Sequence, residues 1–297
     1  MPRTPLISVI MSIYNGEKYL DQALCSILNQ TLSNIEFIII DDGSTDNTKN
    51  IISSYTDDRI KFIQNTQNIG LAASLNKGIS IARGKYIARM DSDDVSYPER
   101  LAKQYSVMEG DQKIDLTGTS AIAISELDVL TGKLPMVLGH KAICSKPWRG
   151  FYLAHPTWMA RREWLHKYKY AIPQSYYSED QELLLRSFEG SKFACLPEVL
   201  FAYRIRSKVS MYKLLKARWA VLGFQKAYFI SRRKFYFMTL AVIVFFLRIT
   251  KDVIKFVLVS ISLDQITKGS FALSQEDRNK WIFVKTAIER DIKRLQS

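Results

Sequence analysis

Three carboxylates stand within four positions at the end of an apolar run, in the segment YIARMDSDDVSYPERL at 86–101. They belong to Asp91, Asp93 and Asp94. Carboxylates at this spacing repel one another and raise one another's pKa unless a cation neutralises them. One interpretation is therefore a site for a divalent metal ion, which prefers oxygen ligands. The other is an acidic turn that caps the following helix, because Asp is a favourable N-cap residue and Pro98 favours a helix start.

Two further acidic pairs occur at the boundaries of predicted elements. Asp41 and Asp42 end the apolar run IEFIII, and Glu179 and Asp180 open the segment SEDQELLLR. A carboxylate in such a place can act as a general base or accept hydrogen bonds from a ligand. Taken singly, the first pair is also compatible with a turn and a helix cap, and the second with acids that are favoured at a helix N-terminus.

The elements that must position these carboxylates alternate between strand and helix. Apolar, β-branched runs predict strands, and apolar residues at helical spacing predict the helices between them. The predicted strands of the first 110 residues are ISVIMSIYN, IEFIIID, RIKFIQN and KYIARMD. The predicted helices are GEKYLDQALCSILNQT, STDNTKNIISSY with Ser44 or Thr45 as its cap, LAASLNKGISIARG ended by Gly84, and PERLAKQYSVME. Units of roughly thirty residues in this order indicate a parallel sheet with βαβ crossovers.

The loops after the strands of such a sheet carry most of the polar candidates. In open α/β sheets, ligands bind beyond the carboxyl ends of the strands. The candidates at these ends are Ser12, Tyr14 and Asn15 after the first strand, Asp41, Asp42, Gly43 and Ser44 after the second, and Asp91, Asp93 and Asp94 after the fourth. A helix cap needs one carboxylate, whereas these loops bring five, so the arrangement favours a binding site.

The pattern after residue 110 is less regular. LTGTSAIAIS predicts a strand, TGKLPMVLGH a turn and a loop, and HPTWMARREWLHKY a strand followed by a helix start. The segment from Ser178 predicts a helix that this residue opens, and KFACLPEVLFAYRIR predicts one or two strands.

The chain resembles the family 2 glycosyltransferases, enzymes of the GT-A fold that transfer a sugar from a nucleotide donor. Five segments carry the resemblance in the family's order: SVIMSIYNGEKYLDQALCSILNQT, IIIDDGSTDNT, NIGLAASLNKGI, ARGKYIARMDSDD and YSEDQELLLR. They lie within roughly residues 6–205. The resemblance implies an α/β, Rossmann-like, mostly parallel sheet flanked by helices. We expect a catalytic domain at 1–206, with a nucleotide-binding half at 1–110 and an acceptor half at 111–206, and a helical C-terminal extension at 207–297.

The resemblance implies a metal site at the DxD motif. Asp91 and Asp93 take its first and last positions and are expected to hold Mn²⁺ or Mg²⁺ against the donor diphosphate. Asp94 is expected to help directly or through water. Ser92, inside the motif, is grouped with the nucleotide-binding residues.

The resemblance also implies a nucleotide site. Asp42 is expected to accept a hydrogen bond from the uracil base, with Asp41 in support. Ser12 and Tyr14 fall where the family contacts the base or the ribose, and Asn76 falls in the segment that lines the nucleotide.

On the acceptor side, the resemblance gives Asp180 the role of general base in an inverting transfer. Glu179 and His155 are expected near the donor or the acceptor, although a lone His beside Pro is also a common structural residue. Arg204 is expected to reach the pyrophosphate or an anionic acceptor, and a basic surface loop is the alternative interpretation.

The charge of the chain is concentrated at its C-terminal end. Residues 201–297 contain 20 Lys and Arg against 6 Asp and Glu, whereas residues 1–200 contain 22 against 23. This imbalance indicates an anionic partner. Basic residues alternate with aromatic ones in KLLKARWAVLGFQKAYFISRRKF, which suits a helix lying at a membrane surface. A helical subdomain with inward apolar faces and a spanning pair of helices remain open, whereas no nucleic-acid-binding motif is present.

Together these features predict an inverting, metal-dependent glycosyltransferase with a UDP-sugar donor. The expected acceptor is a glycan or lipid-linked oligosaccharide in surface polysaccharide synthesis. The expected place is the cytoplasm, peripheral on the inner face of the membrane, since no signal peptide is evident and three widely spaced cysteines indicate a reducing compartment. A nucleotidyltransferase and a non-catalytic nucleotide-binding or scaffold protein are the alternatives.

Overall fold

The computed structural model describes residues 4–173, 178–205, 210–260 and 273–296. One mixed sheet forms its centre, with strands in the order β3-β2-β1-β4-β8-β6-β9-β5 and with β7 paired to β6. The strands are β1 (Ile7–Ile13), β2 (Ile35–Asp41), β3 (Ile60–Gln64), β4 (Tyr86–Met90), β5 (Val95–Ser96), β6 (Leu116–Ile124), β7 (Leu130–Lys133), β8 (Met159–Arg161) and β9 (Phe193–Arg204). The strands β3, β2, β1 and β4 are parallel, as are β6 and β9, and β8 joins the two groups in antiparallel pairing.

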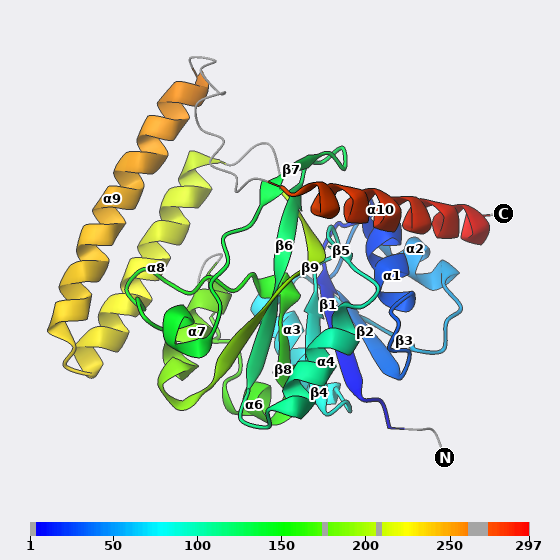
Figure 1. The fold of residues 1–297 in the computed structure, drawn as a ribbon, viewed down its shortest axis with the longest axis horizontal. Coiled ribbons are helices and arrows are strands. Elements are labelled where there is room, and N and C mark those ends of the chain that lie inside the picture. The colour runs from blue at the N-terminus through cyan, green and yellow to red at the C-terminus, as the bar shows by residue number, and fades with distance from the viewer. Residues whose placement is uncertain (1–3, 174–177, 206–209, 261–272, 297) are drawn as a thin grey trace.

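Helices cover both faces of this sheet (Figure 1). They are α1 (Leu20–Leu28), α2 (Thr48–Ser54), α3 (Leu71–Ile81), α4 (Arg100–Gly110), α5 (His140–Ile143), α6 (Arg162–Lys167), α7 (Glu179–Ser187), α8 (Met211–Ser231), α9 (Phe235–Ser260) and α10 (Gln275–Gln296), with short 3₁₀ turns η1 (His155–Thr157) and η2 (Phe188–Gly190). The parallel strands are buried on both faces, which explains their continuous apolar runs. Ile10 packs toward α3, whereas its neighbours Val9 and Met11 pack toward α1 and α4.

Two predicted helix boundaries are wrong. Helix α2 begins at Thr48, after Asn47, so neither Ser44 nor Thr45 caps it. These two residues instead bind the loop after β1, because Asn15 donates its backbone N–H to Ser44 Oγ at 2.9 Å and accepts from the Thr45 N–H at 2.8 Å. Helix α3 ends at Ile81, before Gly84. A side chain at Gly84 would place its Cβ 2.5 Å from the backbone nitrogen of Ser8, so glycine is needed there for close passage along β1.

Two short strands also differ from the predicted pattern. The segment expected to form a turn and a loop contributes most of β7. Strand β5 follows directly after Asp94, the last residue of the acidic loop at 91–94. Both pair with longer strands, β6 and β9 respectively, and are therefore formed by tertiary pairing more than by their own sequence.

The C-terminal residues form two separate structures. Helices α8 and α9 pack side by side as a hairpin that projects from the part of the molecule built around the sheet (Figure 1). The hairpin is anchored by buried side chains, including Phe229 and Phe245, and by stacking of Phe237 on Trp148 at 5.0 Å. Helix α10 instead lies across the part of the molecule built around the sheet, next to α1. Among the described helices, none is both long and apolar enough to cross a membrane.

Candidate active site

The loops after β1, β2 and β4 meet at one edge of the sheet. The Asn15 contacts with Ser44 and Thr45 join the first two loops. A Cβ atom built on Gly16 would lie 3.1 Å from Ser92 Oγ, so the first loop also lies directly against the acidic segment after β4. The parallel order of the strands produces this convergence, since their carboxyl ends point the same way.

A carboxylate triad lies in the loop after β4. One oxygen from each of Asp91, Asp93 and Asp94 lies within 4.8 Å of the others. Asp94 is only 1% exposed; its Oδ1 accepts the Arg204 backbone N–H at 2.7 Å, and its Oδ2 has no hydrogen-bond partner. Burial raises the pKa of Asp94, and the charges of Asp91 and Asp93 raise it further. An unpartnered buried oxygen beside two more carboxylates fits the oxygen ligands of a divalent cation.

Arg89 is a site residue that sequence reasoning missed. It lies on β4 with 6% of its surface exposed, and its Nη2 contacts Asp91 Oδ1 at 2.7 Å. Its Nε and Nη1 have no hydrogen-bond partner. Burial opposes the charged guanidinium, but Asp91, together with Tyr170 and Glu179, more than offsets this effect and the pKa of Arg89 is raised. The available signal was a charged residue in the middle of a buried strand, two positions before the first carboxylate.

The second acidic group surrounds His155. Glu179 and Asp180 begin α7, and Glu179 Oε1 lies 3.6 Å from His155 Nδ1. The other ring nitrogen, Nε2, forms a 2.6 Å hydrogen bond with the Tyr170 hydroxyl, and the imidazole lies against Trp158. The structure therefore brings His155, Glu179 and Asp180 together, as the sequence predicted for the acceptor side, and adds Tyr170.

Burial shifts the pKa values of His155 and Asp180 in opposite directions. Burial lowers the pKa of His155 to about 3, and the charge of Arg89 lowers it while Asp180 and Asp91 oppose that effect. His155 is therefore neutral near pH 7. Desolvation raises the pKa of the Asp180 carboxyl, and Glu179 raises it further while His155 lowers it. A carboxylate with a raised pKa is a stronger base than an ordinary Asp. Asp91 and Asp180 both influence the pKa of His155, so residues of both acidic groups lie near its imidazole.

Two of the residues expected to bind the nucleotide, Asp42 and Asp41, are buried and hydrogen-bonded to the protein. Asp42 is buried; its Oδ1 accepts hydrogen bonds from Asn65 Nδ2 at 2.8 Å and the Ile69 N–H at 3.0 Å, and its Oδ2 accepts one from the Gly70 N–H at 2.9 Å. Asp41 is also buried and accepts from the Ser44 N–H and from Gln64 Nε2.

The other nucleotide candidates divide between the loop and the interior. Ser12 is half-buried at the end of β1, and Tyr14 is 51% exposed in the loop that follows. Asn76 lies on α3, and both ends of its amide bind the backbone of Tyr170, at 2.9 and 3.0 Å. Its amide is thus directed to the protein and not to the carboxylate edge, and it positions the tyrosine that binds His155.

Arg204 occupies a different place from the one expected. Its side chain is fully buried at the end of β9. Its Nε donates to the backbone carbonyl of Asp93 at 2.6 Å, and its other nitrogens bind Ser125, Asp128 and Gln22. The guanidinium also lies 3.9 Å from the centre of the Tyr19 ring. Since protein groups surround it, Arg204 supports the acidic loop from behind and does not face the phosphates of a donor.

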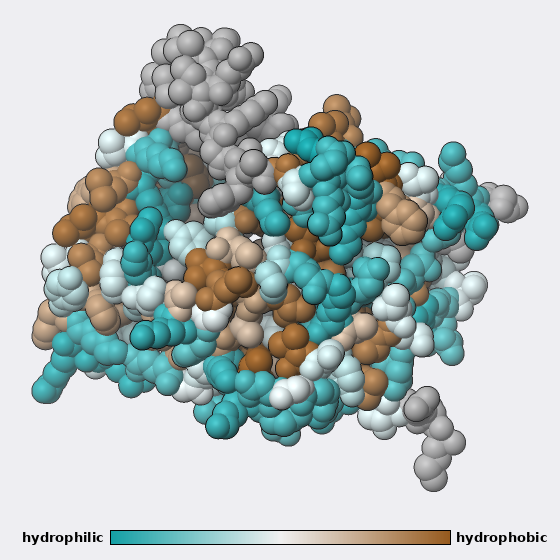
Figure 2. Space-filling model, viewed as in Figure 1, coloured by the Kyte–Doolittle hydropathy of each residue, from teal (hydrophilic) through white to brown (hydrophobic). Residues whose placement is uncertain are grey.

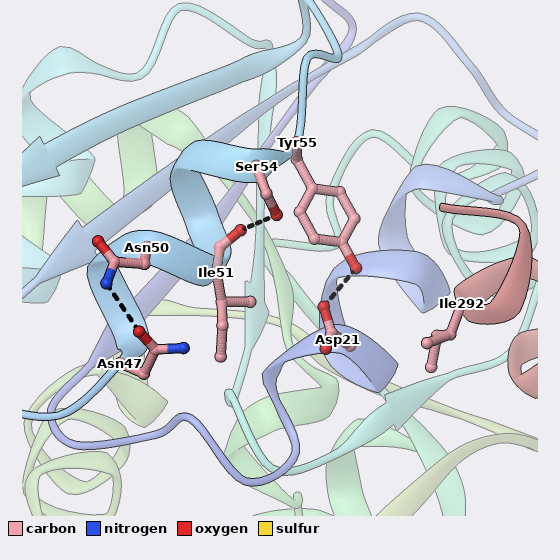
Figure 3. A pocket seen from close by; sticks show the side chains of 7 residues that line it. All are labelled: Asp21, Asn47, Asn50, Ile51, Ser54, Tyr55 and Ile292. Atoms are coloured by element: carbon pink, nitrogen blue, oxygen red, sulfur yellow. Dashed lines mark hydrogen bonds between the residues drawn. The ribbon is translucent and has the colours of Figure 1, made fainter. Parts of the chain in front are cut away.

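A surface pocket of about 270 Å³ lies between α1, α2 and α10 (Figure 3). Its lining includes Asp21, Asn47 and Tyr55, and the Tyr55 hydroxyl donates to Asp21 Oδ1 at 2.8 Å. None of the carboxylates of the two acidic groups lines it. We therefore place the active site at the convergent loops and not in this pocket.

Comparison with known proteins identifies the type of enzyme. The family model described as glycosyl transferase family 2 matches residues 8–169. The chain belongs to this family. It is 36% identical over 232 residues to an uncharacterized glycosyltransferase of Methanocaldococcus jannaschii, with 72% of this chain and 80% of the relative covered. It is 34% identical to the O-antigen biosynthesis glycosyltransferase WbnJ of Escherichia coli, with 77% of this chain and 90% of the relative covered.

Solved structures show the same fold. The S. aureus protein TarS, residues 1–349 in complex with UDP-GlcNAc, superposes on this glycosyltransferase with a TM-score of 0.62 at 18% identity. The match covers 97% of this chain and 82% of that one. The GT-A fold expected from the sequence is thereby confirmed, as is the assignment to a family of glycosyltransferases. Neither a nucleotidyltransferase nor a non-catalytic scaffold is supported.

Proposed function

We propose that this glycosyltransferase transfers a sugar from a UDP-linked donor, with inversion and with the help of Mn²⁺ or Mg²⁺, to a glycan or lipid-linked oligosaccharide. The observation that carries the proposal is the carboxylate triad with its unpartnered Asp94 oxygen, at the loop edge where nucleotides bind in parallel sheets. The crystal structure of TarS with UDP-GlcNAc and the O-antigen role of WbnJ support the donor and the acceptor class.

The triad residues are the proposed ligands of the metal. Asp91, Asp93 and Asp94 offer oxygen atoms of the kind that Mn²⁺ and Mg²⁺ bind. A bound metal ion would supply Lewis-acid stabilisation of the charge that develops on the departing diphosphate. Arg89 holds Asp91 in place by its 2.7 Å contact and puts a positive charge directly behind the triad.

Asp180 is the proposed general base. Its carboxylate takes the proton of the acceptor hydroxyl as that oxygen forms a bond to C1 of the sugar. The bond between C1 and the diphosphate oxygen breaks on the opposite face, and UDP departs with the electron pair, which inverts the configuration. Neutral His155 competes poorly for this proton, because its pKa of about 3 makes it a weaker base than Asp180, whose pKa is raised. Glu179 and Tyr170 hold the imidazole beside the base.

The proposed nucleoside contacts come from the first two loops. Asp42 accepts three hydrogen bonds from the protein, and an ionised carboxylate can accept about four, which leaves one position for the N3–H of uracil. Asp41 supports it, and the exposed Tyr14 ring and the half-buried Ser12 and Ser92 would contact the base and the ribose.

We further propose that the α8–α9 hairpin rests on an anionic membrane surface, where a lipid-linked acceptor is found. The exposed apolar side chains of α9 fall mainly on one stripe of about 120°. The stripe contains Phe235, Tyr236, Ile243, Phe246, Leu247, Val253 and Ile254, whereas the exposed Phe256 falls outside it. Figure 2 shows apolar side chains gathered along this hairpin. Exposed basic residues accompany them, including Lys213, Lys226 and Lys251, and this combination suits a headgroup layer.

Calorimetric titration with UDP, with and without Mn²⁺, tests the donor and the metal. The wild-type chain should bind UDP tightly only with Mn²⁺, and Asp93→Asn should lose the metal-dependent part. Binding of GDP or dTDP in preference to UDP would refute the proposed donor. Equal binding with and without metal would refute the proposed metal site.

A further inference from the structure

We infer that helix α10 positions the loop that carries the carboxylate triad. It does so through a chain of contacts from Trp281 to Asp128 to Arg204. The identification of that loop as a metal site rests on the proposed function. The positioning itself does not depend on that function. It rests on observed contacts between residues that are far apart in the sequence.

The first contact joins Arg204 to the loop. Its backbone N–H binds Asp94 Oδ1 at 2.7 Å, and its Nε binds the Asp93 carbonyl at 2.6 Å. One arginine therefore fixes two consecutive acidic residues. It binds the side chain of Asp94 and the main chain of Asp93. Since the carboxylates of the triad repel one another without a cation, the loop needs such an external restraint.

The second contact fixes Arg204 itself. Its Nη1 binds Asp128 Oδ1 at 2.5 Å, and the second oxygen of Asp128 accepts from Gln22 Nε2 at 3.0 Å. Asp128 belongs to the turn between β6 and β7 and has a φ of +59°, a conformation that costs energy for a residue other than glycine. The turn must therefore be held by its surroundings, and the Tyr19 hydroxyl holds it through the Glu126 carbonyl at 3.0 Å.

The third contact brings in α10. Trp281 is buried, and its indole Nε1 donates to the Asp128 carbonyl at 3.2 Å. Its neighbours Val284 and Ile288 pack in the same apolar cluster as Val95, the residue that follows Asp94. The helix thus supports the acidic loop from two sides, by a hydrogen bond to the turn and by apolar packing beneath β5.

The far end of α10 is anchored independently. Asp291 accepts a hydrogen bond from Asn29 Nδ2 at 2.9 Å, and Ile292 faces the pocket beside α1 and α2 (Figure 3). Because both ends contact the catalytic domain, the helix is a fixed support for the Asp128 turn and the loop beyond it.

The test uses the full-length chain with Trp281→Phe, which removes the indole donor and keeps an aromatic ring, although a smaller one, in the apolar cluster. Asp128→Asn is the second variant, since it keeps the backbone carbonyl and weakens the pairing with Arg204. Phe283→Leu is the matched control, because Phe283 is an exposed aromatic residue on the same helix. Hydrogen exchange of residues 91–96 without metal is measured first, and Mn²⁺ affinity in the presence of UDP second.

Both variants should exchange in the loop about five-fold faster than wild type, as expected when one buried hydrogen bond is lost. Mn²⁺ affinity should fall about ten-fold, the size of effect that outer contacts of metal ligands have. In the double variant, the loss of Mn²⁺ binding free energy should be smaller than the sum of the losses in the two single variants, because both substitutions act through Arg204. Folded variants with unchanged loop exchange would overturn the inference. If wild type binds no Mn²⁺ while the loop exchanges faster in both variants, the positioning stands and the proposed metal site fails.

Discussion

The backbone N–H of Arg204 binds one oxygen of Asp94 at 2.7 Å, and the other oxygen of that carboxylate is buried without a hydrogen-bond partner. This relationship joins the end of β9 to the loop after β4, 110 positions earlier in the chain. It holds a carboxylate in a fixed orientation with one oxygen available to a ligand.

We predict that Asp94→Asn weakens Mn²⁺ binding about ten-fold or more, since one charged oxygen ligand is lost. The amide oxygen can still accept the Arg204 N–H, so the fold should persist. Isothermal calorimetry with Mn²⁺ and UDP measures the effect, with the exposed Asp58→Asn as control. Wild-type metal affinity in Asp94→Asn would remove this residue from the proposed site.

Replacement of Asp180 by Asn should lower kcat by a factor of about 10² to 10⁴, the usual contribution of a general base. UDP affinity should stay close to that of wild type, because the change lies on the acceptor side. The matched control is Glu182→Gln on the same helix, where Glu182 pairs with Arg186 at 2.8 Å outside the His155 group. A kcat close to that of wild type in Asp180→Asn would mean that another residue is the base.

Asp42→Asn should lower the free energy of unfolding as well as UDP affinity. One end of the new amide would be a donor facing the donors of Gly70 or Asn65, which leaves a buried group unsatisfied at a cost of about 1–3 kcal/mol. Urea denaturation measures this loss, with the exposed Glu163→Gln as control. If UDP binding fell while the free energy of unfolding did not change, the three protein hydrogen bonds of Asp42 would not contribute to stability.

The neutral, buried state of His155 predicts a pH dependence of stability. The folded protein keeps His155 unprotonated down to a pKa of about 3, whereas the unfolded chain protonates it below about pH 6.5. The contribution of His155 to the free energy of unfolding is therefore complete above pH 6.5 and falls as the pH decreases. The loss from this group is about 2 kcal/mol at pH 5. His155→Asn should flatten the decrease between pH 7 and 5, and the exposed His166→Asn should not. Denaturant titrations at several pH values give the comparison, and equal slopes in all three proteins would contradict it.

The hairpin should bind vesicles that contain anionic lipid. Phe246→Ser with Leu247→Ser should reduce flotation several-fold, because these side chains are 60% and 64% exposed on the apolar stripe of α9. Leu127→Ser with Leu138→Ser changes exposed apolar residues elsewhere and serves as control. Point substitutions are preferable to truncation after residue 206, which would also remove α10 from the catalytic domain. Equal flotation of both pairs, or none by wild type, would refute the membrane contact.

Local sequence determined the parallel half of the fold and the acidic loops. Buried β-branched runs such as Ile35–Asp41 form strands because burial on both faces requires continuous apolar residues. Once these strands are parallel, their carboxyl ends must lie on one edge, so the meeting of the loops that carry Asn15, Ser44 and Ser92 follows from connectivity.

Tertiary structure alone decided what surrounds these loops. Arg204 was expected to contact the pyrophosphate or an anionic acceptor, but the packing of β9 beside β6 and β5 buries it among protein acceptors. Tyr170 reaches His155, and Trp281 reaches Asp128 across 153 positions. Such contacts depend on the packing of whole elements against one another, whereas periodicity and spacing describe only neighbours along the chain. The carboxylates could therefore be read from the sequence, but the groups that orient them could not.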